Sequence, residues 1–149
     1  MKVVLQRTRA ARVLVEGECA GSIERGVVVL VGVHRDDTPA VADYLAGRCA
    51  DLRIFADESG KMNRSLVETG GEALVISQFT LCGDTSRGRR PGFTEAAHPD
   101  KGKWLYEQFC DRLRTRVTKV ETGVFGAHMQ VELINDGPVT LLLEKNAAE

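Results

Sequence analysis

Apolar residues occur along this chain in two different periods, and each period predicts one kind of element. Short apolar runs and alternations predict strands at 3–5, 13–15, 19–23, 27–33 and 73–76. The run at 27–33 is mostly valine and is broken only by Gly32, which is typical of a strand covered on both faces. Glu16-Gly17-Glu18 separates two of these strands and predicts a hairpin turn.

Two other segments have the helical period. Thr38-Pro39 has the residue types of an N-cap and a first helical position, and apolar residues follow at helical spacing, so we expect a helix over 39–51. Arg112 and Arg116 are expected one turn apart on the exposed face of a second helix, over 100–119. The inward stripe of this second helix is expected to consist of Leu105, Phe109, Leu113 and Val117.

The carboxy-terminal part contains a polar interruption between two strands. Apolar residues predict a half-buried strand at 129–133 and a last strand at 139–143. Between them, Asn135-Asp136-Gly137-Pro138 has the residue types of a tight turn, and the proline has no N–H to give to a sheet. Since X–Pro bonds are cis in only about 5–6% of cases, the residues alone predict a trans Gly137–Pro138 bond in a hairpin turn.

Length and composition fit an α/β protein. Seven or eight strands and two main helices are expected in a single domain over 1–149, and 43% of the residues are hydrophobic, enough for a core. The 20 basic and 21 acidic residues give a net charge of -1, so only a local basic patch could attract nucleic acid. No apolar run is long enough to span a bilayer. We expect a cytoplasmic protein with neither DNA nor membrane as a partner.

Candidate metal ligands are few. The four cysteines contain no Cys-x-x-Cys pair and are expected to be free thiols in a reducing compartment. His34, His98 and His128 have no partner at metal-binding spacing, so we expect them in solvated or packed roles. The pair Asp36-Asp37 precedes the first helix, where negative charge is favourable, which favours a capping role over a metal site. We therefore predict neither a metal nor a cofactor.

A polar segment, Ser77-Gln78-Phe79-Thr80-Leu81, follows a buried strand directly. A hydroxyl, an amide, an aromatic ring and a second hydroxyl at a strand end, where backbone N–H groups can face a ligand oxygen, indicate a candidate catalytic site. A strand that simply meets a polar turn has the same pattern. The stretch 82–99 that follows is rich in glycine and contains Arg87, Arg89 and Arg90, which predicts a long functional loop.

Two motifs together resemble the signatures of the D-aminoacyl-tRNA deacylases. They are Ser77-Gln78-Phe79-Thr80-Leu81 and Asn135-Asp136-Gly137-Pro138-Val139-Thr140, and the spacing between them also fits. The resemblance extends from residue 1 to about 145 through further matching segments: Gln6-Arg7, Val15-Glu16-Gly17, Gly32-Val33, Arg53-Ile54-Phe55, Gly60-Lys61-Met62-Asn63 and Thr122-Gly123-x-Phe125-Gly126-Ala127-x-Met129. The chain departs from the family at Gly92, where a serine is common. Its intact Ser-Gln-Phe segment resembles the standard bacterial type and not the animal relatives with relaxed chiral choice.

The resemblance implies a homodimeric hydrolase that removes D-amino acids, and also misplaced glycine, from the 3′ end of aminoacyl-tRNA. The implied fold is a layered mixed sheet of ββα-sandwich type, partly barrel-like, with the two main helices on one side. The implied catalytic residues are Ser77, Gln78, Phe79 and Thr80, with the N–H groups of the last two stabilising the oxyanion. The terminal 2′-hydroxyl of the tRNA would assist the attacking water.

The same resemblance implies that Gly137 and Pro138 form a cis pair that enters the active site of the partner subunit. There the pair would accept a hydrogen bond from the substrate ammonium and occupy the volume of an L side chain. Arg7 is expected to steady the pair. Phe125 and Met129 match positions that line a pocket for the terminal adenine, although plain core positions explain them equally well.

Several alternatives stay open on the sequence. Thr80 as a covalent nucleophile is the competing mechanism, but no activating histidine or lysine is evident. A non-enzymatic RNA-binding or assembly module, or a general esterase, could be built on the same scaffold. The cluster from Arg87 to Arg90 and the expected pair Arg112 and Arg116 are candidates for phosphate contacts, and solvated surface charge explains them equally well.

Overall fold

The computed structural model describes residues 1–149. Eight strands and three α-helices are present, so the expected number of strands is confirmed and a short third helix is added. In chain order the elements are β1 (Lys2–Val15), β2 (Glu18–Ile23), β3 (Gly26–Gly32), α1 (Pro39–Asp51), β4 (Phe55–Ala56), β5 (Met62–Arg64), α2 (Leu66–Thr69), β6 (Glu72–Ser77), the 3₁₀ helix η1 (Phe79–Cys82), α3 (Pro99–Arg114), β7 (Val120–Thr122) and β8 (Gln130–Glu144).

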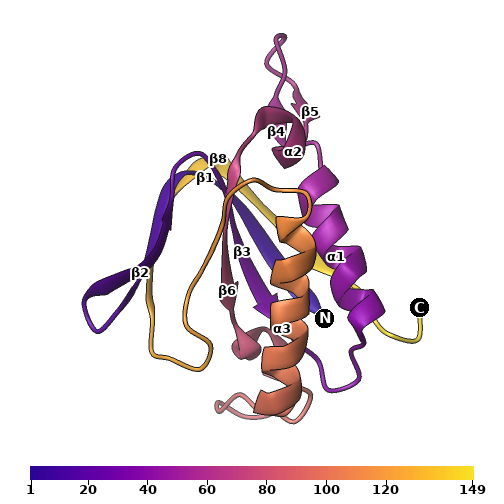
Figure 1. Cartoon of the computed structure of the whole chain (residues 1–149). Coiled ribbons are helices and arrows are strands. Elements are labelled where there is room, and N and C mark those ends of the chain that lie inside the picture. The colour runs from indigo at the N-terminus through magenta and orange to yellow at the C-terminus, as the bar shows by residue number, and fades with distance from the viewer.

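The main sheet is mixed and curls into a nearly closed, barrel-like form (Figure 1). Its strand order is β2-β1-β3-β6-β7, and β8 pairs with β1 on the other edge of that strand. The long strand β1 pairs with β3 through its first half and with β2 through its second half. The pairs β3–β6 and β6–β7 are parallel and all others are antiparallel. The expected partly barrel-like mixed sheet is thus confirmed.

Helices α1 and α3 lie side by side over one face of this sheet, as expected for the two main helices (Figure 1). The bounds of α1 agree with the prediction, with Thr38 at the N-cap and Pro39 at the first position. The largest core cluster, of 24 buried residues, joins the helices to the inner face of the sheet. Buried valines of β3 enter both core clusters, which confirms a strand covered on both faces. No helix is long and apolar enough to cross a membrane.

The expected carboxy-terminal end of α3 is wrong, because the helix stops at Arg114 and not at 119. The Thr115 hydroxyl donates to the Arg112 carbonyl at 2.7 Å, and the chain then turns so that β7 can join the sheet at Val120. The predicted inward stripe is nevertheless buried, including Val117 beyond the helix end. Arg116 is therefore not on a helical face with Arg112: its guanidinium binds the Asp51 carboxylate at 2.6 Å.

The expected hairpin turn at 135–138 is also wrong. Strand β8 continues through this segment, and the Gly137–Pro138 peptide is cis, as the family resemblance implied and the residues alone did not. The pairing of β8 with β1 shifts register here, so residues 136–139 lie outside the ladder. Proline is tolerated because no further strand pairs with this edge of β8.

Asp37 has a different role from the expected helix capping. Its carboxylate binds the amino group of Met1 at 2.6 Å and accepts the His34 N–H at 2.7 Å, and all three groups are buried or half-buried. The side chain thereby joins the start of β1 to the loop after β3. The cysteines are free thiols as expected, three of them buried and Cys19 exposed.

Candidate functional site

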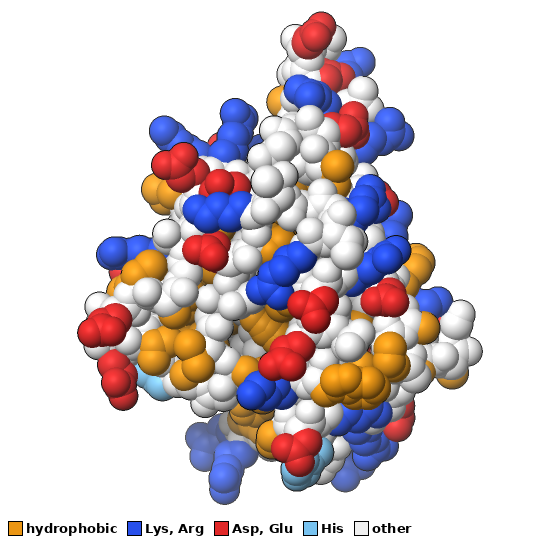
Figure 2. All heavy atoms as spheres, in the orientation of Figure 1, with side chains coloured by type: hydrophobic (Ala, Val, Ile, Leu, Met, Phe, Trp, Pro, Cys, Tyr) orange, Lys and Arg blue, Asp and Glu red, His pale blue; other side chains and the backbone are white.

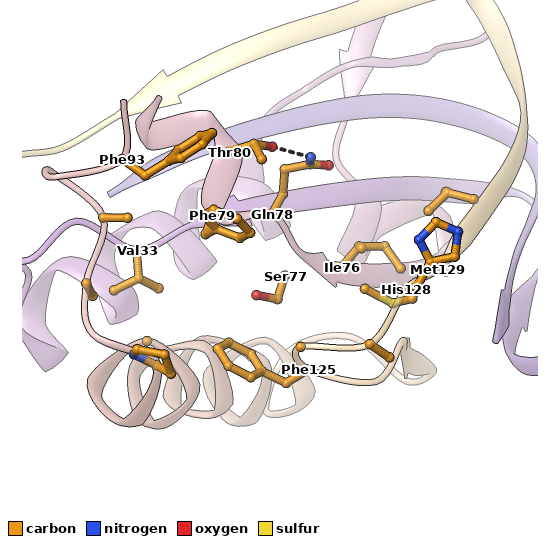
Figure 3. Close-up of a pocket in the computed structure, with 17 residues that line it drawn as sticks. Val33, Ile76, Ser77, Gln78, Phe79, Thr80, Phe93, Phe125, His128 and Met129 are labelled. Atoms are coloured by element: carbon orange, nitrogen blue, oxygen red, sulfur yellow. Dashed lines mark hydrogen bonds between the residues drawn. The ribbon is translucent and has the colours of Figure 1, made fainter. Parts of the chain in front are cut away.

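A cavity opens where the parallel strands β3 and β6 end (Figure 3). Its volume is about 680 Å³, and 10 of its 17 lining residues are hydrophobic, as in sites that bind small organic groups. Six of the nine predicted site residues line it, together with residues of the loop before α3. The lining consists of Val33, Ile76, Ser77, Gln78, Phe79, Thr80, Phe93, Ala96, Ala97, Pro99, Gly102, Phe125, Gly126, Ala127, His128, Met129 and Val131.

The end of β6 sets the position of the catalytic segment. Ser77 is still paired with β3, and the Gln78 N–H donates to the Val31 carbonyl at 2.8 Å before the chain turns into η1. Gly32 permits this turn, because a β-carbon there would lie 2.8 Å from the side chain of Leu81. The predicted strand-end site is therefore built by a close approach of β3 and η1 that only glycine allows.

Two backbone N–H groups are left free at this turn. Phe79 and Thr80 are the first residues of η1, so they have no acceptor within the helix. No strand or loop carbonyl accepts from them either. Both residues line the cavity, and free N–H groups at such a place can stabilise a developing oxyanion.

The side chain of Gln78 is directed to Thr80. Its amide nitrogen donates to the Thr80 hydroxyl at 2.6 Å (Figure 3). An amide is not a base, so this contact orients the hydroxyl without activating it as a nucleophile. The predicted absence of an activating partner for Thr80 agrees with this geometry.

Phe125 and Met129 line the cavity and are half-buried. The rings of Phe79 and Phe125 lie on opposite sides of the Ser77 side chain (Figure 3). Behind Phe125 lies Tyr106, with a ring-to-ring distance of 6.0 Å. The Tyr106 hydroxyl donates to the Val75 carbonyl at 2.7 Å, and burial raises its pKa, so this neutral side chain supports the pocket floor.

Eleven lining residues were not predicted as site residues, and among them His128 is the one with a titratable side chain. His128 lies beside Met129 at the cavity rim and is exposed, which agrees with its expected solvated role but adds a pocket position (Figure 3). Its place one residue before Met129 in a matching segment was the only available signal. No group of three or more His, Cys, Asp or Glu side chains is arranged to hold a metal ion.

The other three predicted residues lie outside this cavity. Gly137 and Pro138 are exposed on β8 and do not line it. The Arg7 guanidinium donates to the Asp136 carbonyl at 2.8 Å and to the Ile54 carbonyl at 2.6 Å, so it does brace this segment. Within one chain, the two signature segments are therefore not brought together.

Side chains of β8 itself also hold the Gly137–Pro138 segment in place. The Asn135 side chain accepts the Val139 N–H at 2.7 Å and donates to the Thr140 hydroxyl at 3.0 Å. Because residues 136–139 are outside the ladder, the carbonyls of Gly137 and Pro138 have no partner on β1. Arg7 and Asn135 thus hold the segment, and its backbone faces solvent.

Comparison with known proteins identifies a matching family and similar relatives. A model of the family described as D-Tyr-tRNA(Tyr) deacylase matches residues 4–144. A protein of Thermotoga petrophila named D-aminoacyl-tRNA deacylase is 56% identical over 98% of each chain. Another of that name, from Symbiobacterium thermophilum, is 56% identical over 97% of this chain and 95% of its own.

Two solved structures share the fold. One, titled c-Myc DNA Unwinding Element Binding Protein, superposes with a TM-score of 0.93 at 39% identity and covers 99% of this chain and 100% of its own. The other, a probable eukaryotic D-amino acid tRNA deacylase, has a TM-score of 0.84 at 21% identity and covers 95% and 97%.

The family match and these relatives define a hydrolase of ester bonds. The chain belongs to the D-Tyr-tRNA(Tyr) deacylase family.

Proposed function

We propose that this protein is an aminoacyl-tRNA editing hydrolase that cleaves the ester of D-aminoacyl-tRNA and releases free D-amino acid and tRNA. The observation that carries the proposal is the pair of free N–H groups at Phe79 and Thr80 in an apolar cavity of nucleoside size. Membership of the deacylase family and the names of the relatives above support the same substrate.

The terminal nucleoside of the tRNA would occupy the cavity, with its adenine beside Phe125 and Met129. The ester carbonyl would then point to the N–H groups of Phe79 and Thr80, while Gln78 orients the neighbouring hydroxyl. An aminoacyl ester is already activated, so positioning and oxyanion stabilisation are sufficient and no protein nucleophile is required. The 2′-hydroxyl of the terminal ribose would assist the attacking water.

The active form is proposed to be a homodimer in which β8 is an interface strand. In the single chain, β8 is a 15-residue edge strand whose outer edge pairs with nothing. It also exposes large apolar side chains: Val131, Ile134, Leu141 and Leu142. A long apolar edge strand left uncovered favours association, and a twofold partner covers such an edge in a closed assembly.

Chiral choice is proposed to come from the partner subunit's copy of the Gly137–Pro138 segment. Its exposed backbone would enter the cavity near Ser77 to Thr80, where its unpaired carbonyls can accept from the substrate ammonium. The same backbone would leave no room for an L side chain, whereas a D side chain would point to solvent. Glycine has no side chain to exclude, so glycyl-tRNA(Ala) is proposed as a second substrate.

The test is to incubate the protein with D-tyrosyl-tRNA, L-tyrosyl-tRNA and glycyl-tRNA(Ala). Rapid loss of the first and third with slow loss of the second is expected. Equal and slow loss of both tyrosyl esters would contradict the proposal and favour a non-catalytic nucleic-acid-binding module, a function to which the 39% identical DNA-binding relative lends some weight. Hydrolysis of simple esters at the same rate would instead indicate a general esterase.

A second experiment separates the two mechanisms at Thr80. Thr80→Val removes the hydroxyl but keeps the volume and the backbone N–H. We expect a loss within about tenfold, since orientation and not nucleophilic attack is assigned to that hydroxyl. A loss on the order of 10⁴-fold or more would make Thr80 the nucleophile.

A further inference from the structure

Three arginines lie without acidic partners on the loop that directly precedes the cavity residue Phe93. Arg87, Arg89 and Arg90 are exposed, and none of them forms a salt bridge. Other exposed arginines, such as Arg12 and Arg116, do pair with carboxylates. The whole chain has a net charge of -1, so this uncompensated cluster is a local feature and not part of a general positive charge.

These arginines lie on residues 84–92, the arginine loop, which is closed by backbone hydrogen bonds. Asp84 and Gly92 exchange two backbone hydrogen bonds of 2.7 and 2.9 Å, which close the loop at its base. The Asp84 carboxylate accepts the Ser86 N–H at 2.9 Å, and hydrogen bonds from Ser86 lower the pKa of that carboxyl. This carboxylate forms no salt bridge with any of the three arginines.

The base of the loop is attached to the site. Phe93 follows Gly92 directly, lines the cavity and packs edge-on against Phe79 with 5.1 Å between ring centroids. Figure 1 shows this loop, between η1 and α3, at the same lower end of the molecule as the ends of β3 and β6. Figure 2 shows Lys and Arg side chains projecting at that lower end. The loop therefore lies at the end of the molecule where the cavity opens.

The chemistry of the loop fits a phosphodiester chain. Arginine guanidinium groups bind phosphate oxygens through paired N–H donors, and contacts of this kind position a nucleic acid without reading its bases. Resting on the proposed function, we propose that Arg87, Arg89 and Arg90 bind backbone phosphates of the single-stranded 3′ end of the tRNA, immediately before the terminal nucleoside held in the cavity. The arginine loop thus supplies tRNA affinity, whereas the cavity supplies the chemistry.

The family departure at Gly92 is compatible with this role. A β-carbon at Gly92 would meet nothing within 4 Å, and its backbone groups are already bonded to Asp84. A serine would therefore fit there without moving the loop. The glycine removes one hydroxyl and leaves the arginines in place.

The test compares a tRNA ester with an ester that has no phosphates. Initial rates are measured with D-tyrosyl-tRNA and with 3′-O-(D-tyrosyl)adenosine for the wild type and for R87Q/R89Q/R90Q. We expect KM for the tRNA to rise about tenfold or more at 0.1 M salt while kcat is kept, because up to three phosphate contacts are lost. The log–log salt dependence of kcat/KM should become flatter by about 2. Hydrolysis of the adenosine ester should be unchanged.

A matched control removes three arginines elsewhere. Arg25, Arg48 and Arg64 are exposed and also form no salt bridge. They lie near the start of β3, the end of α1 and β5, at the opposite end of the molecule (Figure 1). R25Q/R48Q/R64Q should keep the wild-type KM and salt dependence, and R87K/R89K/R90K should recover most of the affinity.

The outcomes separate the two proposals. If the wild type does not hydrolyse D-tyrosyl-tRNA, the proposed function fails. If it does, and the loop variant keeps KM and the salt dependence, or if the opposite-end control changes them equally, the phosphate contacts are disproved. Equal losses on the tRNA and the adenosine ester would also overturn them, because the loop would then act on the cavity through Phe93.

Discussion

The two signature segments of this chain are held in opposite ways. Residues 77–80 continue from a buried strand, and their position is fixed by β3 below them and by Phe93 and Phe125 beside them. Residues 136–138 lie on an edge strand, outside its ladder with β1, and are held by Arg7 and by the Asn135 side chain. One segment faces a cavity and the other faces solvent. A single chain thus assembles the proposed catalytic segment in a cavity and leaves the proposed chirality element outside that cavity.

The largest effect is expected where the free N–H groups lie. Phe79→Pro removes one N–H at the first position of η1. We expect kcat/KM for D-tyrosyl-tRNA to fall by about 10²–10³ relative to Phe79→Ala, which loses the same ring but keeps the N–H. Equal activity of these two variants, measured by initial rates, would remove the oxyanion role from this segment.

A smaller but more selective effect is expected on the other segment. Gly137 has a φ of +150°, and a β-carbon there would lie 2.8 Å from the Val139 nitrogen. Gly137→Ala should therefore displace the segment, lower kcat/KM for the D-tyrosyl ester by roughly 10–100-fold and lower the ratio of D to L hydrolysis with it, since a shift of about 1 Å can cost 10² in rate. The measurement is kcat/KM for both tyrosyl esters.

The control for that variant is Gly17→Ala in the turn between β1 and β2. Gly17 has a φ of +80°, and a β-carbon added there would meet nothing within 4 Å, so the substitution introduces a similar backbone strain away from any site. It should lower the melting temperature and leave the D to L ratio unchanged. A similar loss of selectivity in both variants would show that Gly137 acts only through stability.

Arg7 holds the Gly137–Pro138 segment through hydrogen bonds, and a substitution there tests this role. Arg7→Met removes the hydrogen bonds to the Asp136 and Ile54 carbonyls, and we expect the free energy of unfolding to fall by about 1–3 kcal/mol, together with some D to L selectivity. Arg12→Met breaks an exposed pair with Glu132 on the same two strands and should change neither quantity measurably. Urea unfolding of the two variants checks this, and equal losses would deny Arg7 a special role.

The smallest expected effect concerns Thr8, which pairs with Asn135 where the register of β8 shifts. Its hydroxyl is fully buried and has no hydrogen-bond partner. Thr8→Val should therefore raise the free energy of unfolding by about 1 kcal/mol. Thr140→Val, which removes a hydroxyl bonded to Asn135 and Gln6, should lower it instead. Stabilisation by both variants would contradict the bonding assigned to this segment.

The local sequence pattern predicted most of the helices and strands. The predictions failed where contacts between residues far apart in the sequence determine the structure. The valine run of β3 and the Thr38-Pro39 start of α1 have local causes, and both were predicted correctly. The end of α3 depends on the entry of β7 into the sheet, and the binding of Asp37 to Met1 joins residues far apart in sequence. Neither contact leaves a periodic signal.

The same distinction between local pattern and distant contacts applies to the candidate site. The polar end of β6 was one candidate from residue types alone, but a strand that simply meets a polar turn has the same pattern. The course of β8 through Pro138 could not be predicted from residue types, since the residues there are those of a turn and its edge position is a property of the whole sheet. Family resemblance supplied what local chemistry could not.

The most direct test of a site shared between two copies mixes two impaired variants. Phe79→Pro lacks the N–H proposed to stabilise the oxyanion, and Gly137→Ala is expected to have a displaced 136–138 segment. If random exchange forms mixed dimers, half of the dimers contain one intact site, so about a quarter of the wild-type rate on D-tyrosyl-tRNA should return. If each chain completed its own site, mixing would give no more than the average of the two parent rates, and the cross-subunit account would be wrong.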